Sequence, residues 1–313
     1  MEVMDWDGVR VSRLTLGTVQ LGMPYGIANR SGQPDERTTR EMLEHAIDGG
    51  IVSFDTAQGY GSSEAVLGRY LGGNPDFTII SKTVPDVQPH ESEADIERNL
   101  TQKIEHSLEK LKLRQMPVVL LHHASDLLKY GRKLKTACKS LVRNGYVKKW
   151  GVSFGADPVS VTREIWPVAR DSLFEAVQVP VNVLDHRLLV SGLLRVMNEA
   201  GKLIFARSIF LQGLFFLETD DIPPKLEAAG PWLIRLKNIA QREGITLPEL
   251  VVAFVRDLPW IHSLVIGAEK PGQIAKNLDW FYGASLSDRA RSDIAALAAD
   301  TPELVISPHL WNA

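Results

Sequence analysis

The feature that most constrains the fold is an alternation of short apolar runs with longer amphipathic segments, repeated along the whole chain. The apolar runs are rich in Val, Ile and Leu and barely alternate with polar residues. This pattern is typical of strands that are buried on both faces of a parallel sheet. The eight predicted strands cover residues 13–18, 51–56, 77–82, 117–123, 147–153, 175–182, 202–208 and 262–268.

Helical patterns lie between these runs. Segment 35–50, for example, has apolar spacing near that of a helix and ends in two glycines that can cap it. The other predicted helices lie at 63–73, 91–113, 131–147, 157–171 and 183–202, with two more between 231 and 257. A strand followed by a helix, eight times, predicts an α/β fold: a (β/α)8 TIM barrel forming a single domain over residues 1–313. A doubly wound sheet is the alternative, but no strand is followed by G-x-G-x-x-G.

Composition excludes several classes of function. The net charge is −3, and no basic block suggests nucleic-acid binding. The acidic N-terminus lacks the apolar region of a signal peptide, and the most apolar stretch, 203–217, is interrupted by Arg207 and Gln212, so no membrane span is expected. The lone cysteine, Cys138, excludes an internal disulfide and fits a reducing compartment. We therefore expect a cytoplasmic protein. Because many such barrels are monomers, a monomer or a weak oligomer is expected.

Polar side chains gather where the predicted strands end, which is where barrel enzymes place their active sites. Asp55 ends the second strand, Lys82 ends the third, and His122 and His123 end the fourth. Tyr60 follows the second strand, between two glycines. Each residue alone has an ordinary structural explanation, such as a turn, a solvated charge or a structural hydrogen bond. An acid, an amine, a phenol and an imidazole at one face indicate catalysis.

This set of groups suits the reduction of a carbonyl. A carbonyl that accepts a hydride needs a proton on its oxygen, and a free tyrosine, with a pKa near 10, donates one poorly at neutral pH. A lysine ammonium such as that of Lys82 stabilises a phenolate and so favours donation. Asp55 can hold the lysine in place, and a histidine can orient the carbonyl oxygen. Tyr60 is therefore the predicted proton donor.

The chain resembles the aldo-keto reductase superfamily over nearly its whole length. The resemblance lies in "FDTAQGYGSSEAVLG", "VVLLHHASD", "GYVKKWGVSFG" and "VIGAEKPGQIAKNL". The tetrad of the family matches Asp55, Tyr60, Lys82 and His122. His122 is preferred to His123 because it follows two apolar residues, and because neighbours on a regular strand point to opposite faces.

The resemblance implies NAD(P)H bound in an extended form across the barrel, without a Rossmann domain. It assigns Ser153 and Gln178 to the nicotinamide carboxamide, Thr18 to the ribose, Ser208 to Gly213 to the pyrophosphate, and Gly267, Gln273 and Asn277 to the adenosine segment. The expected walls of the substrate pocket are the loops 23–34, 124–131 and 209–224.

The sequence departs from the family pattern at several positions. Phe154 replaces an Asn found in many members, and Arg207 stands where many members stack a tyrosine on the nicotinamide. Gly267 and Gln273 replace the Lys and Arg of some NADPH-specific members, which leaves Lys270 as the candidate cation. Because the Lys270 cation can pair with a 2′-phosphate, we predict NADPH as the preferred cofactor, with NADH as the alternative.

The leading hypothesis is an enzyme that transfers a hydride from NAD(P)H to an aldehyde or ketone, a small-molecule carbonyl. Stretch 15–34 resembles family members found among surface-polysaccharide enzymes, which indicates a sugar-like substrate. One alternative is a non-catalytic or slow NAD(P)H-binding barrel that regulates a protein partner. Another is a metal-dependent barrel hydrolase or isomerase that uses His122, His123, Asp55 and a further carboxylate. No H-x-H or H-E-x-x-H motif supports a metal site, so none is predicted.

Overall fold

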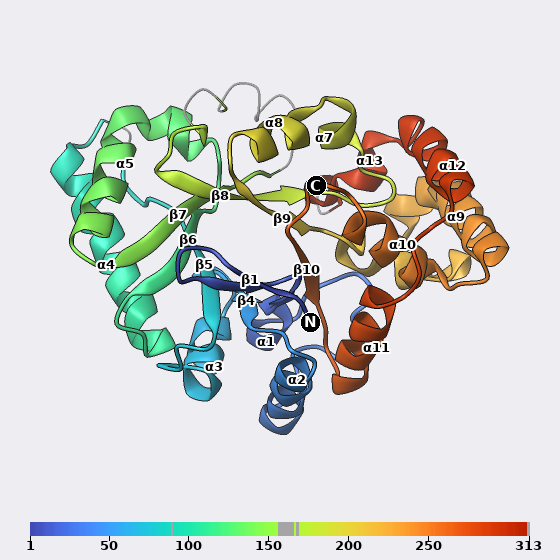
Figure 1. Ribbon diagram of the computed structural model, residues 1–313, viewed down its shortest axis with the longest axis horizontal. Helices are drawn as coiled ribbons and strands as arrows, with labels where there is room; N and C mark the ends of the chain where they lie inside the picture. Colours follow the sequence, from blue (N-terminus) through green and yellow to red (C-terminus); the bar gives the residue numbers. More distant parts are fainter. Residues whose placement is uncertain (89, 156–165, 167–168, 312–313) are drawn as a thin grey trace.

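The computed structural model describes residues 1–88, 90–155, 166 and 169–311 (Figure 1). Within this part of the chain, eight parallel strands close into a barrel in the order β10-β3-β4-β5-β6-β7-β8-β9, which confirms the predicted (β/α)8 barrel. Its strands are β3 (Leu14–Gly17), β4 (Ser53–Asp55), β5 (Thr78–Thr83), β6 (Met116–Leu121), β7 (Val147–Ser153), β8 (Phe174–Pro180), β9 (Leu203–Arg207) and β10 (Ser263–Gly267). That the domain spans all of residues 1–313 stays a prediction.

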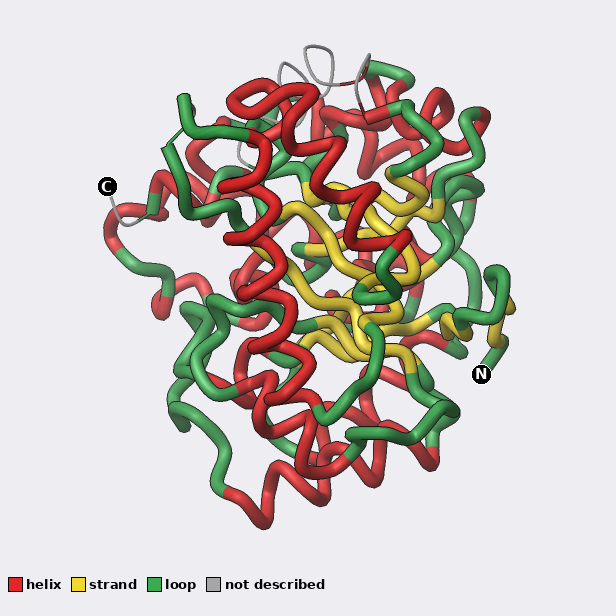
Figure 2. The backbone as a smooth tube through the Cα atoms, turned by 90° about the vertical axis from the view of Figure 1, so that its left-hand side faces the viewer, coloured by secondary structure: helices red, strands yellow, loops and turns green. Residues whose placement is uncertain are grey.

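Helices surround the strands on the outside (Figure 2). They are α1 (Val19–Gly22), α2 (Glu36–Asp48), α3 (Ser63–Tyr70), α4 (Glu93–Leu111), α5 (Asp126–Arg143), α7 (Arg187–Val190), α8 (Leu193–Glu199), α9 (Gly230–Glu243), α10 (Leu247–Arg256), α11 (Pro271–Phe281), α12 (Asp288–Ala299) and α13 (Glu303–Ile306). Short 3-10 helices are η1 (Leu211–Phe216), η2 (Thr219–Asp221), η3 (Pro224–Ala229) and η4 (Pro308–Leu310).

The predicted helices are present wherever the structure describes the chain, with two differences. The helix predicted at 131–147 begins earlier, at Asp126, and is interrupted at Gly131 by a non-helical conformation (φ 54°, ψ −128°). The helix predicted at 183–202 is split into α7 and α8, because Gly192 takes a left-handed conformation (φ 73°) between them. Most of the helix predicted at 157–171 lies outside the described residues.

Local capping explains where several helices begin. Asp35 accepts a hydrogen bond from the Thr38 N–H at the start of α2. Ser92 and Thr246 start α4 and α10 with capping boxes, in which side chain and backbone satisfy each other's free groups. These signals are readable in the sequence, and they fix the helices that pack around the barrel.

A short hairpin closes the N-terminal end of the barrel. Strands β1 (Val3–Asp5) and β2 (Arg10–Ser12) pair antiparallel, and Trp6 and Val9 exchange backbone hydrogen bonds across a two-residue turn. Asp7 and Gly8 in that turn have positive φ (49° and 73°), as a type I′ turn requires. The sequence analysis did not predict this hairpin, although the Asp-Gly pair is its usual signal.

The hairpin and the strands share one buried cluster inside the barrel. Its members are Val9, Val11, Ile80, Val118, Leu120, Ala176, Leu203 and Phe205. Since this cluster fills the end of the barrel that the hairpin covers, a site is expected at the C-terminal strand ends. Side chains alternate along a strand, so the inward positions two residues further on belong to Lys82, Gln178 and Arg207, while His122 directly follows the end of β6.

Candidate active site

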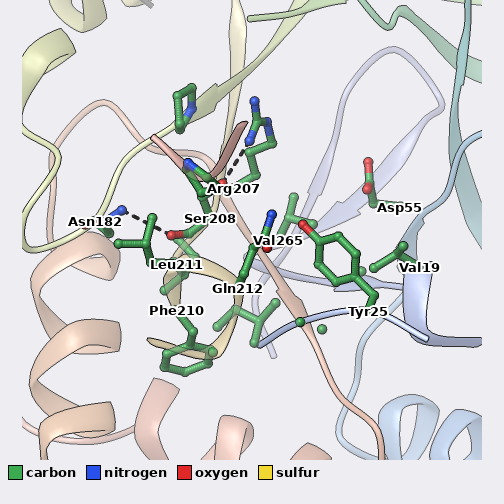
Figure 3. Close-up of a pocket in the computed structure, with 18 of the residues that line it drawn as sticks. Val19, Tyr25, Asp55, Asn182, Arg207, Ser208, Phe210, Leu211, Gln212 and Val265 are labelled. Carbon is green, nitrogen blue, oxygen red and sulfur yellow. Dashed lines mark hydrogen bonds between the residues drawn. The ribbon is translucent and has the colours of Figure 1, made fainter. Parts of the chain in front are cut away.

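A cavity of about 770 Å³ opens at the C-terminal strand ends (Figure 3). All four residues of the predicted catalytic tetrad line it. Of the ten predicted cofactor residues, the nine that line it are Thr18, Ser153, Gln178, Arg207, Ser208, Gly213, Gly267, Gln273 and Asn277. Sequence reasoning therefore brings widely separated residues to one cavity, with Lys270 as the exception.

Asp55 and Lys82 form a buried ion pair at the floor of the cavity. Lys82 Nζ donates to both carboxylate oxygens of Asp55 at 2.8 and 2.7 Å, and to the Thr56 carbonyl oxygen at 2.8 Å. The Lys82 and Asp55 side chains are only 1% and 6% exposed. Gln178 Nε2 donates to Asp55 Oδ1 at 2.7 Å. The lysine is thus fixed by its partners, and breaking the pair would leave an uncompensated buried charge.

Tyr60 lies beside this ion pair, in the loop between β4 and α3. Lys82 Nζ lies 4.9 Å from the centre of the Tyr60 ring. The ring also meets the His122 ring edge to face, with centroids 6.1 Å apart and an interplanar angle of 84°. The phenol therefore has a cation on one side and an imidazole on another.

Two glycines fix the loop that carries Tyr60. A Cβ on Gly22 would lie 1.8 Å from the Tyr60 carbonyl oxygen, and a Cβ on Gly61 would lie 2.2 Å from the Gly22 carbonyl oxygen. Two stretches of backbone therefore meet where no side chain fits. Gly61 also has a positive φ of 54°. The close backbone contact and the positive φ thus explain why a glycine follows Tyr60.

His122 follows directly after β6, and its N–H donates to the Thr83 carbonyl oxygen at 2.9 Å. Burial, and then the positive charge of Lys82, lowers the pKa of His122 to about 3. The imidazole is therefore neutral at neutral pH. Its ring stacks on that of His123 with centroids 5.0 Å apart, and both residues line the cavity. Because β6 ends at Leu121, the strict alternation used to separate the two histidines does not apply to them.

The side chains at the floor fit a nicotinamide carboxamide. Gln178 Oε1 is buried and has no hydrogen-bond partner among the described residues, so it could accept from an amide NH2. Ser153 is also buried, at the end of β7. Thr18, by contrast, already uses its hydroxyl on the Asp55 carbonyl oxygen and the Ser63 hydroxyl. These bonds join the ends of β3 and β4, and the position of Thr18 near the ribose stays a prediction.

The loop after β9 has an unusual backbone. Ser208, Leu211 and Gln212 have positive φ angles of 59°, 48° and 54° although none is glycine. Asn182 Nδ2 holds the Ser208 carbonyl oxygen at 3.2 Å, as Figure 3 shows. Left-handed residues beside right-handed ones turn successive N–H groups to one side and can bind an anion. Such strain is typical of ligand-binding segments.

Arg207 begins this loop and faces the cavity. Its guanidinium donates to the Phe154 carbonyl oxygen and to the Ser208 hydroxyl, both at 2.8 Å. Its charge also contributes to lowering the pKa of His122. The guanidinium is therefore held in one orientation near the reacting groups.

Loop 23–34 crosses the mouth of the cavity and touches the loop after β9. The Ile27 N–H donates to the Gln212 carbonyl oxygen at 2.9 Å. Tyr25, in the same loop, lines the cavity, and burial raises the pKa of its phenol. Two of the three expected wall loops, 23–34 and 209–224, therefore contribute to the cavity. The third, 124–131, does not line it.

Several residues of the wall were not predicted. Arg187 holds Asp185 through two hydrogen bonds of 2.8 Å and lies 3.5 Å from the Ser307 hydroxyl, which ties the C-terminal segment 306–309 to the cavity. Gln20, Glu269 and Trp280 also line it. No local pattern marks these residues, because only tertiary packing brings them here.

The side chain of Lys270 is exposed and does not line the cavity. Its neighbour Glu269 does line it, and burial raises the pKa of that carboxyl. Gln273 Oε1 accepts hydrogen bonds from the N–H groups of Glu269 and Lys270 at 2.6 and 3.2 Å. The start of α11 therefore presents a carboxylate to the cavity where the sequence analysis expected an ammonium.

In the described part of the chain, no cluster of three or more His, Cys, Asp or Glu side chains is arranged to hold a metal ion. No helix in the same residues is both long and apolar enough to cross a membrane.

A parallel barrel with an acid, a lysine, a tyrosine and a histidine at its C-terminal mouth defines a class of reductases that bind nicotinamide cofactors. A model of the Aldo/keto reductase family matches residues 13–299, and the chain belongs to this family. It is therefore an NAD(P)H-dependent oxidoreductase of the aldo-keto reductase type, as predicted.

Individual relatives agree with this assignment. The chain is 24% identical to the aldo-keto reductase YhdN of Bacillus subtilis, over 96% of this chain and 94% of the relative. The holo form of the aldo-keto reductase AKR11C1 from Bacillus halodurans has a similar fold, with a TM-score of 0.74 and 19% identity over 95% and 96% of the two chains. The glycerol dehydrogenase AKR11B4 from Gluconobacter oxydans gives a TM-score of 0.70 and 21% identity over 97% and 96%.

Proposed function

We propose that this protein reduces an aldehyde or ketone with Tyr60 as the proton donor. The observation that carries the proposal is the position of Tyr60 between the Lys82 ammonium and the His122 imidazole, on one cavity wall. Bound NAD(P)H supplies the hydride. A proton passes from the Tyr60 hydroxyl to the substrate oxygen, and Lys82 stabilises the negative charge left on the phenol oxygen.

The other two members of the tetrad position these groups. Asp55 holds the Lys82 ammonium in place through its two oxygens. His122, neutral because its pKa is about 3, can donate a hydrogen bond to the substrate oxygen without competing as an acid. Gln178 and Ser153 would hold the carboxamide, and Ser208 to Gly213 would follow the pyrophosphate, with Thr18 fixing the backbone beneath.

The choice between the two nicotinamide cofactors depends on neighbouring side chains of opposite charge. Lys270 supports NADPH, because an ammonium can pair with a 2′-phosphate. Glu269 opposes it, because a carboxylate on the wall repels the phosphate and can accept from a free 2′-hydroxyl. We keep the proposal that NADPH binds more tightly than NADH. It holds only if the attraction of the 2′-phosphate to Lys270 exceeds its repulsion by Glu269.

The substrate is proposed to be a small sugar-like or polyol-like carbonyl. Stretch 15–34 carries this proposal, and the glycerol dehydrogenase among the structural relatives agrees with it. A monomer or weak oligomer in the cytoplasm, acting without nucleic acid or membrane, stays a prediction.

The first experiment is a difference-spectrum titration with NADPH and NADH, followed by a panel of aldehydes, ketones and sugars. We expect saturable cofactor binding and turnover of at least one carbonyl. Tightly retained cofactor with no turnover across the panel would favour a regulatory barrel that acts through a protein partner.

A further inference from the structure

Two histidine rings lie face to face where β6 ends at the cavity. The ring centroids of His122 and His123 are 5.0 Å apart, and the two ring planes are inclined by only 11°. The His122 ring also meets the Tyr60 ring at 84°, with centroids 6.1 Å apart. All three side chains line the cavity. The reaction proposed above gives His123 no part, so its stacking on a member of the tetrad needs an explanation.

No hydrogen bond fixes the orientation of the His122 ring. Within the described residues, neither of its ring nitrogens has a hydrogen-bond partner. A functional histidine is usually oriented by a hydrogen bond at the ring nitrogen that faces away from the reaction. Because a ring N–H donates in the plane of the ring, rotating the ring turns this donor away from the substrate oxygen. Packing against the neighbouring rings therefore sets the orientation of His122.

The backbone that carries the two rings is fixed on both sides. The His122 N–H donates to the Thr83 carbonyl oxygen, at the end of β5, at 2.9 Å. The Ala124 N–H donates to the Ser153 carbonyl oxygen, at the end of β7, at 3.2 Å. Since the backbone is held between the two strands that flank β6, the freedom left to each imidazole is rotation about its side-chain bonds. A flat ring stacked on His122 limits that rotation.

His123 is itself supported by Asp126, in the first turn of α5. The Asp126 N–H donates to the His123 carbonyl oxygen at 3.0 Å. The Asp126 side chain is buried, and its Oδ2 has no hydrogen-bond partner among the described residues. Burial raises the pKa of this carboxyl, and the positive charge of His123 opposes the rise. The buried carboxylate therefore attracts the His123 imidazole and helps to hold it beside His122.

We propose that His123 is a positioning residue, whose ring stacks on that of His122 and keeps the His122 N–H directed at the substrate oxygen. This inference rests on the proposed role of His122 in orienting that oxygen. His123 itself neither holds the substrate nor transfers a proton. Only the flat shape of its ring is required, so another flat side chain can replace it.

The test is a double-mutant cycle in the full chain, with kcat, the KM of one good aldehyde and the affinity for the cofactor measured for each variant. His123→Leu keeps an apolar side chain but removes the flat ring, and His123→Phe restores a ring. Both are made in the parent and in His122→Asn. His106→Leu is the matched control, because His106 is an exposed histidine on α4 that does not line the cavity.

We expect His123→Leu to lower kcat by roughly ten-fold, with the KM of the aldehyde and the cofactor affinity nearly unchanged. His123→Phe should recover most of this loss, and His106→Leu should match the parent. His122→Asn should itself be slower by roughly 10². In that background His123→Leu should cause no further loss, because the ring that it positions is gone.

Equal kcat in His123→Leu and the parent would overturn this inference, while a slow His122→Asn would leave the role of His122 standing. A loss that persists in His122→Asn would also overturn it, because His123 would then act on the substrate or the fold and not through His122. So would a His123→Phe as slow as His123→Leu, since the imidazole and not the flat ring would then be needed. Parent-like turnover in His122→Asn would refute the proposed role of His122 together with the inference.

Discussion

At the reaction end of the cavity, which comprises Asp55, Tyr60, Lys82 and His122, the charged groups are buried and hold each other by short hydrogen bonds. At the α11 end, Glu269, Gln273 and Trp280 line the cavity and Lys270 lies beside them outside it, and these side chains are partly or fully exposed. Preorganised groups lower a reaction barrier because they need no rearrangement. Exposed groups around a helix start change affinity by smaller amounts. Substitutions at the reaction end should therefore change rate, and those at the α11 end should change cofactor affinity.

The largest effect is expected for Lys82→Met, which removes the charge beside Tyr60 and leaves Asp55 buried without its cation. Turnover should fall by roughly 10² to 10⁴, and the free energy of unfolding should fall by about 3–5 kcal/mol. Stopped-flow reduction and urea unfolding measure the two effects. Lys149→Met is the matched control, because Lys149 is a buried, paired lysine near the hairpin. It should lose stability but keep turnover, and parent-like turnover in Lys82→Met would contradict the account.

A smaller loss is expected for Asp55→Asn, which keeps the shape of the side chain. Lys82 retains the Thr56 carbonyl oxygen as a partner, so its position is loosened and not lost. We expect turnover to drop by about ten-fold, less than for Lys82→Met. Turnover of Asp55→Asn and of Lys82→Met should be measured at saturating cofactor. A loss equal to that of Lys82→Met would mean that Asp55 acts in the reaction itself.

His122 should make the protein sensitive to acid. Its pKa is lowered in the folded state to about 3, from an unfolded value near 6.5, so its contribution to stability is intact above pH 6.5 and declines as the pH falls toward 3. Between pH 7 and pH 4.5 the free energy of unfolding should fall in both proteins. The fall should be about 1–2 kcal/mol smaller for His122→Asn than for the parent. Urea midpoints at both pH values measure this. His106→Asn, at an exposed position on α4 away from the cavity, is the control and should keep the acid dependence of the parent.

The smallest effects are expected at the α11 end. Glu269→Gln should favour NADPH by a few-fold, because it removes a carboxylate that faces the cavity. Lys270→Met should disfavour NADPH by a few-fold and leave NADH nearly untouched. Both are measured as the ratio of the two dissociation constants at low salt. If Lys270→Met leaves that ratio unchanged, Lys270 does not favour NADPH and the proposed preference is wrong.

The sequence predicts the reaction end better than the α11 end, and the reason is geometric. Lys82, Gln178 and Arg207 belong to strands, whose two-residue period and shared C-terminal edge decide which side chains meet. Lys270 and Glu269 lie in the turn before α11, where no period decides which of two neighbours faces the cavity. The segment 306–309 reaches the cavity through Arg187, a contact between residues more than a hundred positions apart.

The central claim is that Tyr60 donates the proton, and Tyr60→Phe tests it most directly because only a hydroxyl is removed. The rate of cofactor oxidation should be measured in a single turnover, with a good aldehyde substrate and with chemistry as the limiting step. The account predicts a fall of roughly 10² to 10⁴ with cofactor affinity unchanged, while Tyr25→Phe, at the other phenol on the wall, keeps most of the rate. Reduction by Tyr60→Phe at the rate of the parent would contradict the claim.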